Sequence, residues 1–252
     1  MLAALGLLHM VFLAFAVVAG QAGGHKSFYC YHSGVTNTLD NSFPSPSFAG
    51  SLETVFLDRD GVVNEKMPEG RYVKRWDEFH VLPGVVEAIG LLNTAGIRVV
   101  VVSNQRGVAL GLYTDQDVRS IHAGFQKLLE ARGAHVDAFY FCPHDKGRCA
   151  CRKPLPGMFE QAVAEFPSIA AATSVMIGDT LSDIEFGQRL GIATVYLEGD
   201  PERHKPGLEV ARELADMRFP SLHEAVTGLL ARLTAYRLSP SSMCLGFPAN
   251  PR

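Results

Sequence analysis

Short, β-branched apolar runs alternate with longer amphipathic stretches through the middle of this sequence, and this alternation limits the possible folds more than any other feature. The runs 54–57 and 98–102 are typical of buried strands, whereas residues 83–94 place Val86, Ile89 and Leu92 on one helical face. Together they predict a βαβ unit. The same alternation predicts further helices at 114–132, at 156–166 and after Ser182, and further strands at 136–141, 174–177 and 193–197.

Strands that are apolar along their whole length belong in a sheet that is covered on both faces, and helical connections allow such strands to run parallel. We therefore predict an α/β fold, with a parallel sheet and helices on both faces. Thr114, Pro156 and Ser182 stand where three of the helices should begin, as N-cap or first-turn residues. In such a fold the carboxyl ends of the strands form the ligand-binding edge.

Polar residues collect at this edge. The first strand runs into Asp58 and Asp60, the second into Ser103, and the strand at 174–177 into Asp179. Any strand must end in a polar turn, and Asp-Gly and Gly-Asp are common turn pairs, so one such group alone would mean little. Three groups, each directly after an apolar strand, favour a shared site.

The two ends of the chain differ from this middle. Residues 1–20 are apolar apart from one histidine and are just long enough to cross a bilayer, but they lack the basic start of an export signal. A signal or anchor, a wrongly chosen start codon and an additional buried helix all fit this leader. Residues 21–53 predict a disordered linker and residues 236–252 a tail, so the folded unit is expected at 54–235.

Composition and charge exclude several classes of partner. The chain has 23 Lys and Arg against 26 Asp and Glu, a net charge of −3, and it has no basic cluster that would suggest DNA or RNA. It also lacks a Walker loop and a Gly-x-Gly-x-x-Gly pattern, so no nucleotide cofactor is implied. We expect a monomeric, cytoplasmic protein, with export or membrane attachment only if residues 1–20 are a genuine signal or anchor.

Four side chains that bind transition metals lie within ten positions, at Cys142, His144, Cys149 and Cys151. Three thiolates and one imidazole suit a tetrahedral Zn²⁺ ion in a closed, structural site. A disulfide, or unpaired cysteines beside a surface histidine, would use only some of the four groups. We therefore predict zinc, which would stiffen a loop that leads directly into Arg152 and Lys153.

Taken in order, Asp58-x-Asp60-Gly61, Ser103-Asn104, Lys153 and Gly178-Asp179-x-x-x-Asp183 resemble the four motifs of the haloacid dehalogenase superfamily. The resemblance spans residues 54–200 and implies a Rossmann-like sheet and Mg²⁺-dependent phosphate transfer through an aspartyl phosphate. The run NQRGVALGLYT at 104–114 and the Cys-His-Cys-Cys loop resemble one branch, the D-glycero-D-manno-heptose-1,7-bisphosphate 7-phosphatases and the related histidinol-phosphate phosphatases. The run is closer to the heptose enzymes.

The resemblance also implies roles for the acidic residues. Asp58 is the nucleophile and a Mg²⁺ ligand, and Asp179 is a further ligand. Asp60 offers its backbone carbonyl to the metal and its carboxyl as general acid and then general base. A general acid must carry a proton when substrate arrives, so we expect the crowded carboxylates to raise the pKa of Asp60.

Charge supports the need for a metal ion. A phosphate dianion beside three carboxylates carries five negative charges, and Lys153 with Arg152 offsets only two of them. Mg²⁺ suits such a site because it prefers carboxylate, carbonyl and phosphate oxygens. By the same resemblance, Ser103 and Lys153 hold the transferring phosphoryl group, and Asp183 orients metal-bound water or Lys153.

The predicted helices and strands fill the intervals between the motifs, so we expect no large cap domain over the site. A small phosphorylated sugar would then be bound by loops, and the candidate contacts are Asn64, Asn104, Arg106, Arg152 and the segment 65–75. Arg106 and Arg152 could hold a second, non-reacting phosphate, or could be ordinary solvated surface residues.

Hydrolysis of the 7-phosphate of heptose bisphosphate is the preferred function. Histidinol phosphate is the nearest rival substrate, and a mutase or a non-catalytic phosphosugar-binding scaffold would also fit the same motifs. The lack of a cap that would exclude water disfavours the mutase. The presence of Asp58, Asp60, Lys153 and Asp179 disfavours the scaffold.

Overall fold

The computed structural model describes residues 51–200, 202 and 206–237. The apolar leader at 1–20, nearly all of the predicted linker and most of the predicted tail lie outside these residues. Within the part of the chain that is described, no helix combines the length and the apolar character that a membrane crossing requires.

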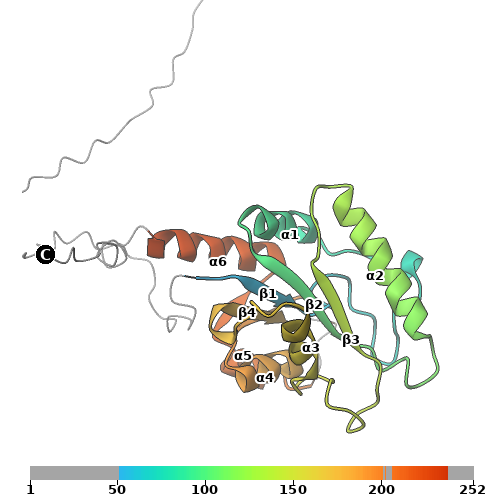
Figure 1. Ribbon diagram of the computed structural model, residues 1–252. Helices are drawn as coiled ribbons and strands as arrows, with labels where there is room; N and C mark the ends of the chain where they lie inside the picture. The colour runs from blue at the N-terminus through green and yellow to red at the C-terminus, as the bar shows by residue number, and fades with distance from the viewer. Residues whose placement is uncertain (1–50, 201, 203–205, 238–252) are drawn as a thin grey trace, which may run out of the picture. The chain divides into compact units, whose positions relative to one another are not determined.

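Six parallel strands form one sheet in the order β3-β2-β1-β4-β5-β6 (Figure 1). The strands are β1 (Thr54–Leu57), β2 (Arg98–Asn104), β3 (Ala138–Cys142), β4 (Ser174–Gly178), β5 (Ala193–Leu197) and β6 (Met217–Phe219). β1 lies between β2 and β4, so the chain winds away from β1 first in one direction and then in the other. Ligands bind at such a reversal in doubly wound sheets.

Helices cover both faces of this sheet. They are α1 (Val85–Thr94), α2 (Asp115–Glu130), α3 (Gly157–Glu165), α4 (Leu181–Leu190), α5 (Leu208–Leu214) and α6 (Leu222–Arg237), with short 3₁₀ turns η1 (Trp76–Glu78) and η2 (Ala171–Thr173). Figure 1 shows α1, α2 and α6 on one side of the sheet and α3, α4 and α5 on the other. The predicted two-faced arrangement is confirmed.

The strand β1 illustrates how the sequence builds the two cores. Val55 and Leu57 point to one face and are buried in the same cluster as side chains of α1, α2 and α6. Phe56 points to the other face and packs in a cluster with Met158 of α3 and Phe186 of α4. These three side chains are fully buried, so an apolar run without alternation is what this central strand requires.

Two helices near the site begin with reciprocal caps. The side chain of Thr114 accepts a hydrogen bond from the backbone N–H of Asp117, whose carboxylate accepts one from the backbone of Thr114. Thr180 and Asp183 make the same exchange at the start of α4, so Ser182 lies in the first turn of α4 and Thr180 is its cap. The boundary expected after Ser182 therefore moves to Leu181.

The described residues between β1 and β4 form only the elements named above and the loops that join them. No separate cap domain is inserted in this part of the chain, as expected. The loop from Asp58 to Gly84 and the loop from Pro143 to Pro156 both begin at the carboxyl edge of the sheet. These loops border the site described next.

Candidate active site

Three carboxylates meet at the carboxyl edge of the sheet. Asp58 directly follows β1, Asp179 directly follows β4, and Asp183 comes from the first turn of α4. One oxygen of each lies within 4.8 Å of the others. Because like charges this close repel strongly at buried positions, the cluster needs cations to stabilise it.

Lys153 supplies the first cation. Its Nζ lies 2.8 Å from Oδ1 of Asp58 and 2.7 Å from Oδ1 of Asp183, and it donates to the carbonyl of Val102 at 2.6 Å. Burial of the ammonium works against its charge, but Asp183 and Asp58 outweigh burial and raise the pKa of Lys153. The structure thus brings Lys153 together with Asp58 and Asp183.

Asn104, at the end of β2, fixes the backbone that carries Lys153. Its Nδ2 donates to the carbonyl of Lys153 at 3.1 Å, and the backbone N–H of Lys153 donates to its Oδ1 at 3.0 Å. Asn104 is among the expected substrate contacts, but both halves of its amide hold the loop against the sheet.

Lys66 is a second cation at the cluster, and the sequence did not identify it. Its Nζ forms an ion pair with Oδ2 of Asp179, and the two side chains are only 7% and 9% exposed. Lys66 lies in the segment 65–75, which was expected by position alone to contact substrate. No local pattern could reveal this ion pair, because 113 positions separate its partners.

Glycines let the carboxylates approach the backbone closely. A Cβ atom at Gly61, whose φ is +103°, would lie 2.3 Å from Oδ2 of Asp179. A Cβ atom at Gly178 would lie 2.1 Å from Cβ of Asp183. A larger residue at either position would force Asp179 or Asp183 to move, so the glycines of the first and last motifs help to shape the site.

The electrostatics of the cluster show an excess of negative charge. Burial and the charge of Asp183 raise the pKa of Asp58. Burial also raises the pKa of Asp179 to about 6, with Asp58 and Asp183 adding to the effect and Lys66 opposing it. Oδ1 of Asp179 is buried and makes no hydrogen bond to a described residue. A divalent cation that prefers oxygen ligands fits this set of donors.

The pKa of Asp60 shifts in the direction opposite to the expected one. Nη2 of Arg59 donates to both of its oxygens, at 2.8 and 2.9 Å, and Asn64 and Gln105 donate further hydrogen bonds at 3.1 and 2.9 Å. Burial alone would raise the pKa of Asp60, but the charge and hydrogen bonds of Arg59 outweigh burial and lower it. The predicted rise is wrong, because it counted the carboxylates and left out the adjacent guanidinium.

Gln105 connects Asp60 to the second motif. Its Nε2 also donates to Oγ of Ser103 at 2.7 Å, and its Oε1 accepts a hydrogen bond from the hydroxyl of Tyr113 at 2.7 Å. Ser103 is 1% exposed and lies at the carboxyl end of β2. Gln105 and Tyr113 belong to the run 104–114, so this run orients Ser103 and Asp60 together.

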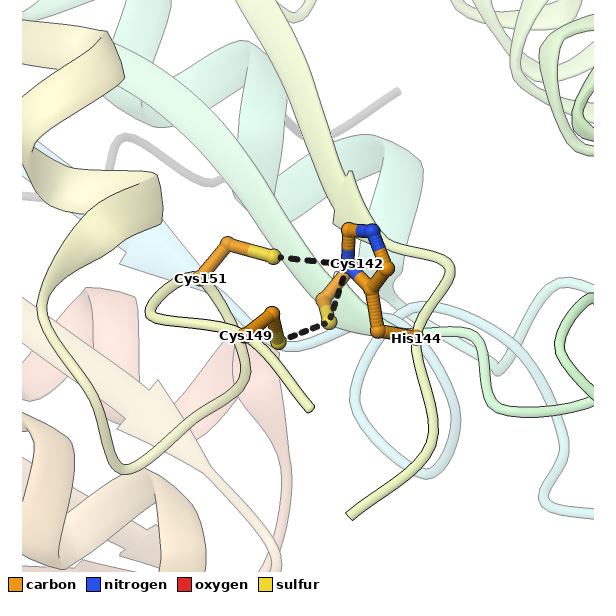
Figure 2. A group of neighbouring side chains, drawn as sticks. All are labelled: Cys142, His144, Cys149 and Cys151. Carbon is orange, nitrogen blue, oxygen red and sulfur yellow. Dashed lines mark hydrogen bonds between the residues drawn. The ribbon is translucent and has the colours of Figure 1, made fainter. Parts of the chain in front are cut away.

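The four metal-binding side chains of the loop after β3 also come together, as Figure 2 shows. Sγ of Cys142 lies 3.5 Å from Sγ of Cys149 and 3.7 Å from Nδ1 of His144. The same Nδ1 lies 3.3 Å from Sγ of Cys151. All three thiols are free.

These separations suit a single tetrahedral ion. With metal–sulfur bonds of about 2.3 Å and metal–nitrogen bonds of about 2.0 Å, two ligand atoms of a tetrahedron lie roughly 3.5–3.8 Å apart. A disulfide would instead bring two sulfurs to about 2.05 Å. The loop can therefore hold a metal ion and does not have the geometry of a disulfide.

The two candidate arginines differ in their surroundings. Nε of Arg106 lies 2.6 Å from Oδ1 of Asp145, which directly follows His144 in the loop after β3, and both side chains are about two-fifths exposed. Nη1 of Arg152 is buried and makes no hydrogen bond to any described residue. Arg152 is thus the better-placed donor for a further anion.

Comparison with known proteins agrees with this geometry. A family model for haloacid dehalogenase-like hydrolases matches residues 39–191. The D-glycero-alpha-D-manno-heptose-1,7-bisphosphate 7-phosphatase of Mycobacterium tuberculosis is 40% identical over 177 residues, which cover 70% of this chain and 90% of the relative. The D-glycero-beta-D-manno-heptose-1,7-bisphosphate 7-phosphatase of Yersinia pestis is 35% identical over 190 residues, covering 72% of this chain and 97% of the relative.

A solved structure also resembles this chain in both fold and sequence. The D,D-heptose 1,7-bisphosphate phosphatase of B. bronchiseptica, crystallised with magnesium and phosphate, matches with a TM-score of 0.64 and 32% identity, over 72% of this chain and 99% of that one. The resemblance inferred from the motifs is confirmed. With its motif residues gathered at one edge of a parallel sheet, the chain belongs to the haloacid dehalogenase-like hydrolase family.

Proposed function

We propose that this chain is a Mg²⁺-dependent phosphatase that removes the 7-phosphate of D-glycero-D-manno-heptose 1,7-bisphosphate through an aspartyl-phosphate intermediate. The observation that carries the proposal is the contact of Asp58 with Lys153, beside Asp179, at the carboxyl edge of the sheet. The names of the two relatives support the substrate, and the magnesium and phosphate of the B. bronchiseptica crystals support the cofactor and the chemistry.

Asp58 would act as the nucleophile. Its carboxylate oxygen forms a bond to phosphorus while the bond from phosphorus to the sugar oxygen breaks. Lys153 favours the ionised form of Asp58, against the effect of burial, and so keeps the nucleophile available. Lys153 and Ser103 would also hold the oxygens of the transferring phosphoryl group.

Asp60 would move the protons. It gives one to the departing sugar oxygen and then takes one from the water that attacks the aspartyl phosphate. Because Arg59, Asn64 and Gln105 hold Asp60 ionised without substrate, Asp60 must take up a proton from solvent when the substrate binds. A phosphate dianion beside Asp60 would raise its pKa, since it disfavours a second negative charge nearby.

The residues that would hold Mg²⁺ are Asp58 and Asp179, through their carboxylates, and Asp60, through its backbone carbonyl. When bound, the ion supplies positive charge that offsets the phosphate and the carboxylates. Asp183 would position the other residues of the site, because it contacts the ammonium of Lys153 at 2.7 Å and caps α4 through Thr180.

We further propose that Cys142, His144, Cys149 and Cys151 bind a structural Zn²⁺ ion. The tetrahedral spacing of the four donor atoms supports this choice. The ion would anchor the loop that presents Arg152 and Lys153 to the substrate. Free thiols that bind metal also suit a reducing compartment, and on this ground we propose that the enzyme works in the cytoplasm.

The rest of the substrate would lie on the loops around the site. Arg152, with its unpartnered buried Nη1, would bind the second phosphate, and Arg106 would contribute from beside the metal-binding loop. Asn64 and Asn104 would act mainly by holding Asp60 and Lys153 in position. We propose that the enzyme acts as a monomer on this small phosphorylated sugar alone, without nucleic acid.

Phosphate release from the full chain tests the proposal. We expect Mg²⁺-dependent turnover of the heptose bisphosphate, little turnover of histidinol phosphate, and no turnover in Asp58→Asn. A matched Asp77→Asn variant, at an exposed position of η1, should retain turnover. Substantial hydrolysis by Asp58→Asn would refute the covalent mechanism, and faster hydrolysis of histidinol phosphate would refute the substrate.

A further inference from the structure

Lys66 is a buried charge at the carboxylate cluster to which the proposed reaction gives no role. It comes from the loop between β1 and α1, and its ammonium contacts Oδ2 of Asp179. Asp179 is also a proposed Mg²⁺ ligand, and its other oxygen, Oδ1, is buried without a hydrogen bond. The lysine therefore occupies one face of a carboxylate that the metal ion requires.

An ammonium and a divalent cation cannot both lie close to one buried carboxylate without strong repulsion between them. Either the metal binds weakly in the presence of Lys66, or the ammonium moves away as the metal binds. Gly61 adds to this constraint, because its missing Cβ is what lets Asp179 lie against the loop that carries Lys66. The backbone at Gly61 thus permits the close approach, and charge holds the two partners together.

The structure provides room for the ammonium to move. A cavity of about 410 Å³ is lined by both Lys66 and Asp179. Its wall also includes the acidic residues Glu65 and Asp200, together with Glu198, which is paired with Arg212. A lysine side chain that left Asp179 would remain in a negatively charged surrounding, so its release does not require full exposure to solvent.

We propose that Lys66 is an internal counter-cation that competes with the divalent metal ion for Asp179. Without metal, its charge offsets the repulsion among Asp58, Asp179 and Asp183 and stabilises the fold. With metal, the ammonium leaves Asp179 for the adjacent cavity. This inference rests on the proposed metal site and adds to it a residue that sets the affinity for the ion.

Calorimetric titration of MgCl₂ into the full chain, without substrate, tests the competition. The protein is freed of Mg²⁺ by dialysis without a chelator, so that the metal-binding loop is left undisturbed. Lys66→Met should bind Mg²⁺ about tenfold more tightly than the wild type, a change of about 1.4 kcal/mol. Lys74→Met, which removes an exposed lysine of the same loop, should bind like the wild type, and Lys66→Arg should stay near it because the charge is kept.

The outcomes separate this inference from the proposed function. If the wild type binds Mg²⁺ and Lys66→Met binds it equally or more weakly, the competition is refuted and the metal site stands. If neither the wild type nor Lys66→Met binds Mg²⁺, the proposed metal site itself is refuted, and the competition with it.

Thermal unfolding gives a second, independent measurement. Without Mg²⁺, Lys66→Met should unfold at a lower temperature than the wild type, because the three carboxylates lose a counter-charge. Added Mg²⁺ should then raise its unfolding temperature by more than it raises that of the wild type. Equal increments in the two proteins would also overturn the competition. Lys66→Gln serves in the same comparison if Lys66→Met does not fold.

Discussion

Replacing Lys153 by Met should destabilise the fold as well as abolish turnover. The side chain of Lys153 is 1% exposed and its ammonium lies between Asp58 and Asp183, so its removal leaves two buried carboxylates without their shared cation. Met has a similar length and fills the space, so the loss is one of charge and hydrogen bonds and not of packing. Removing one partner of a buried ion pair costs about 3–5 kcal/mol.

Urea unfolding without Mg²⁺ measures this cost. For a domain of this size, with a slope of about 2 kcal/mol per molar urea, the midpoint should fall by roughly 1.5–2.5 M. Lys127→Met, which removes an exposed lysine of α2, should change the free energy of unfolding by less than about 0.5 kcal/mol.

A double variant identifies the cause. Asp183→Asn can still accept the hydrogen bond from Thr180 through its carbonyl oxygen, but it removes one of the buried negative charges. If uncompensated charge causes the loss, Lys153→Met with Asp183→Asn should be more stable than the sum of the single changes by about 1–3 kcal/mol. If the two changes in the free energy of unfolding are additive, or if Lys153→Met alone loses less than about 1 kcal/mol, then the ammonium of Lys153 does not stabilise the buried carboxylates.

Three further predictions concern other parts of the molecule. Asp60→Asn should lower kcat by about 10²–10⁴-fold, because the leaving oxygen loses its proton donor; kcat within threefold of the wild type would assign the proton transfer to another group. Cys149→Ser should lower the zinc content well below one ion per chain by elemental analysis, and a full ion per chain would exclude Cys149 as a ligand. Burial and the nearby charge of Arg59 lower the pKa of His122 from 6.5 to about 3. Between these two pH values the imidazole is protonated in the unfolded state but neutral in the folded state. The free energy of unfolding should therefore fall by up to about 1.4 kcal/mol for each pH unit as the pH falls from 6.5 toward 3. His122→Phe, which can keep the stacking on Phe139, should weaken the pH dependence of urea unfolding below pH 6.5, and an unchanged dependence would show that His122 does not bind the proton.

The sequence predicted the features that depend on local pattern. The strands 54–57 and 193–197 lie where the apolar runs placed them, and the order of the motifs identified the family. No element was predicted after residue 197, so α5, β6 and α6 were all missed, although α6 carries a clear helical face of Leu222, Val226, Leu229 and Leu233. The spacing of these apolar residues could have predicted that helix.

The ion pairs around the site were harder to predict, because they depend on which residues the fold brings into contact. Arg59 is adjacent to Asp60 in the sequence, but only the fold shows that its guanidinium turns back onto that carboxylate and not toward solvent. Lys66 reaches Asp179 only because the loop after β1 folds against the end of β4. The sequence identified the groups that we propose do the chemistry, and the structure was needed to find the cations that lie beside them.

The amide of Asn104 ties the backbone of Lys153 to β2 at two points in a structure that holds no substrate. The conformational entropy of the Lys153 backbone is therefore lost once, when the chain folds, and need not be lost again each time a substrate binds. Substitutions in the outer loops can then alter which sugar is accepted without disturbing the position of the reactive charge. Such a separation would allow related enzymes to diverge in specificity while sharing one reaction.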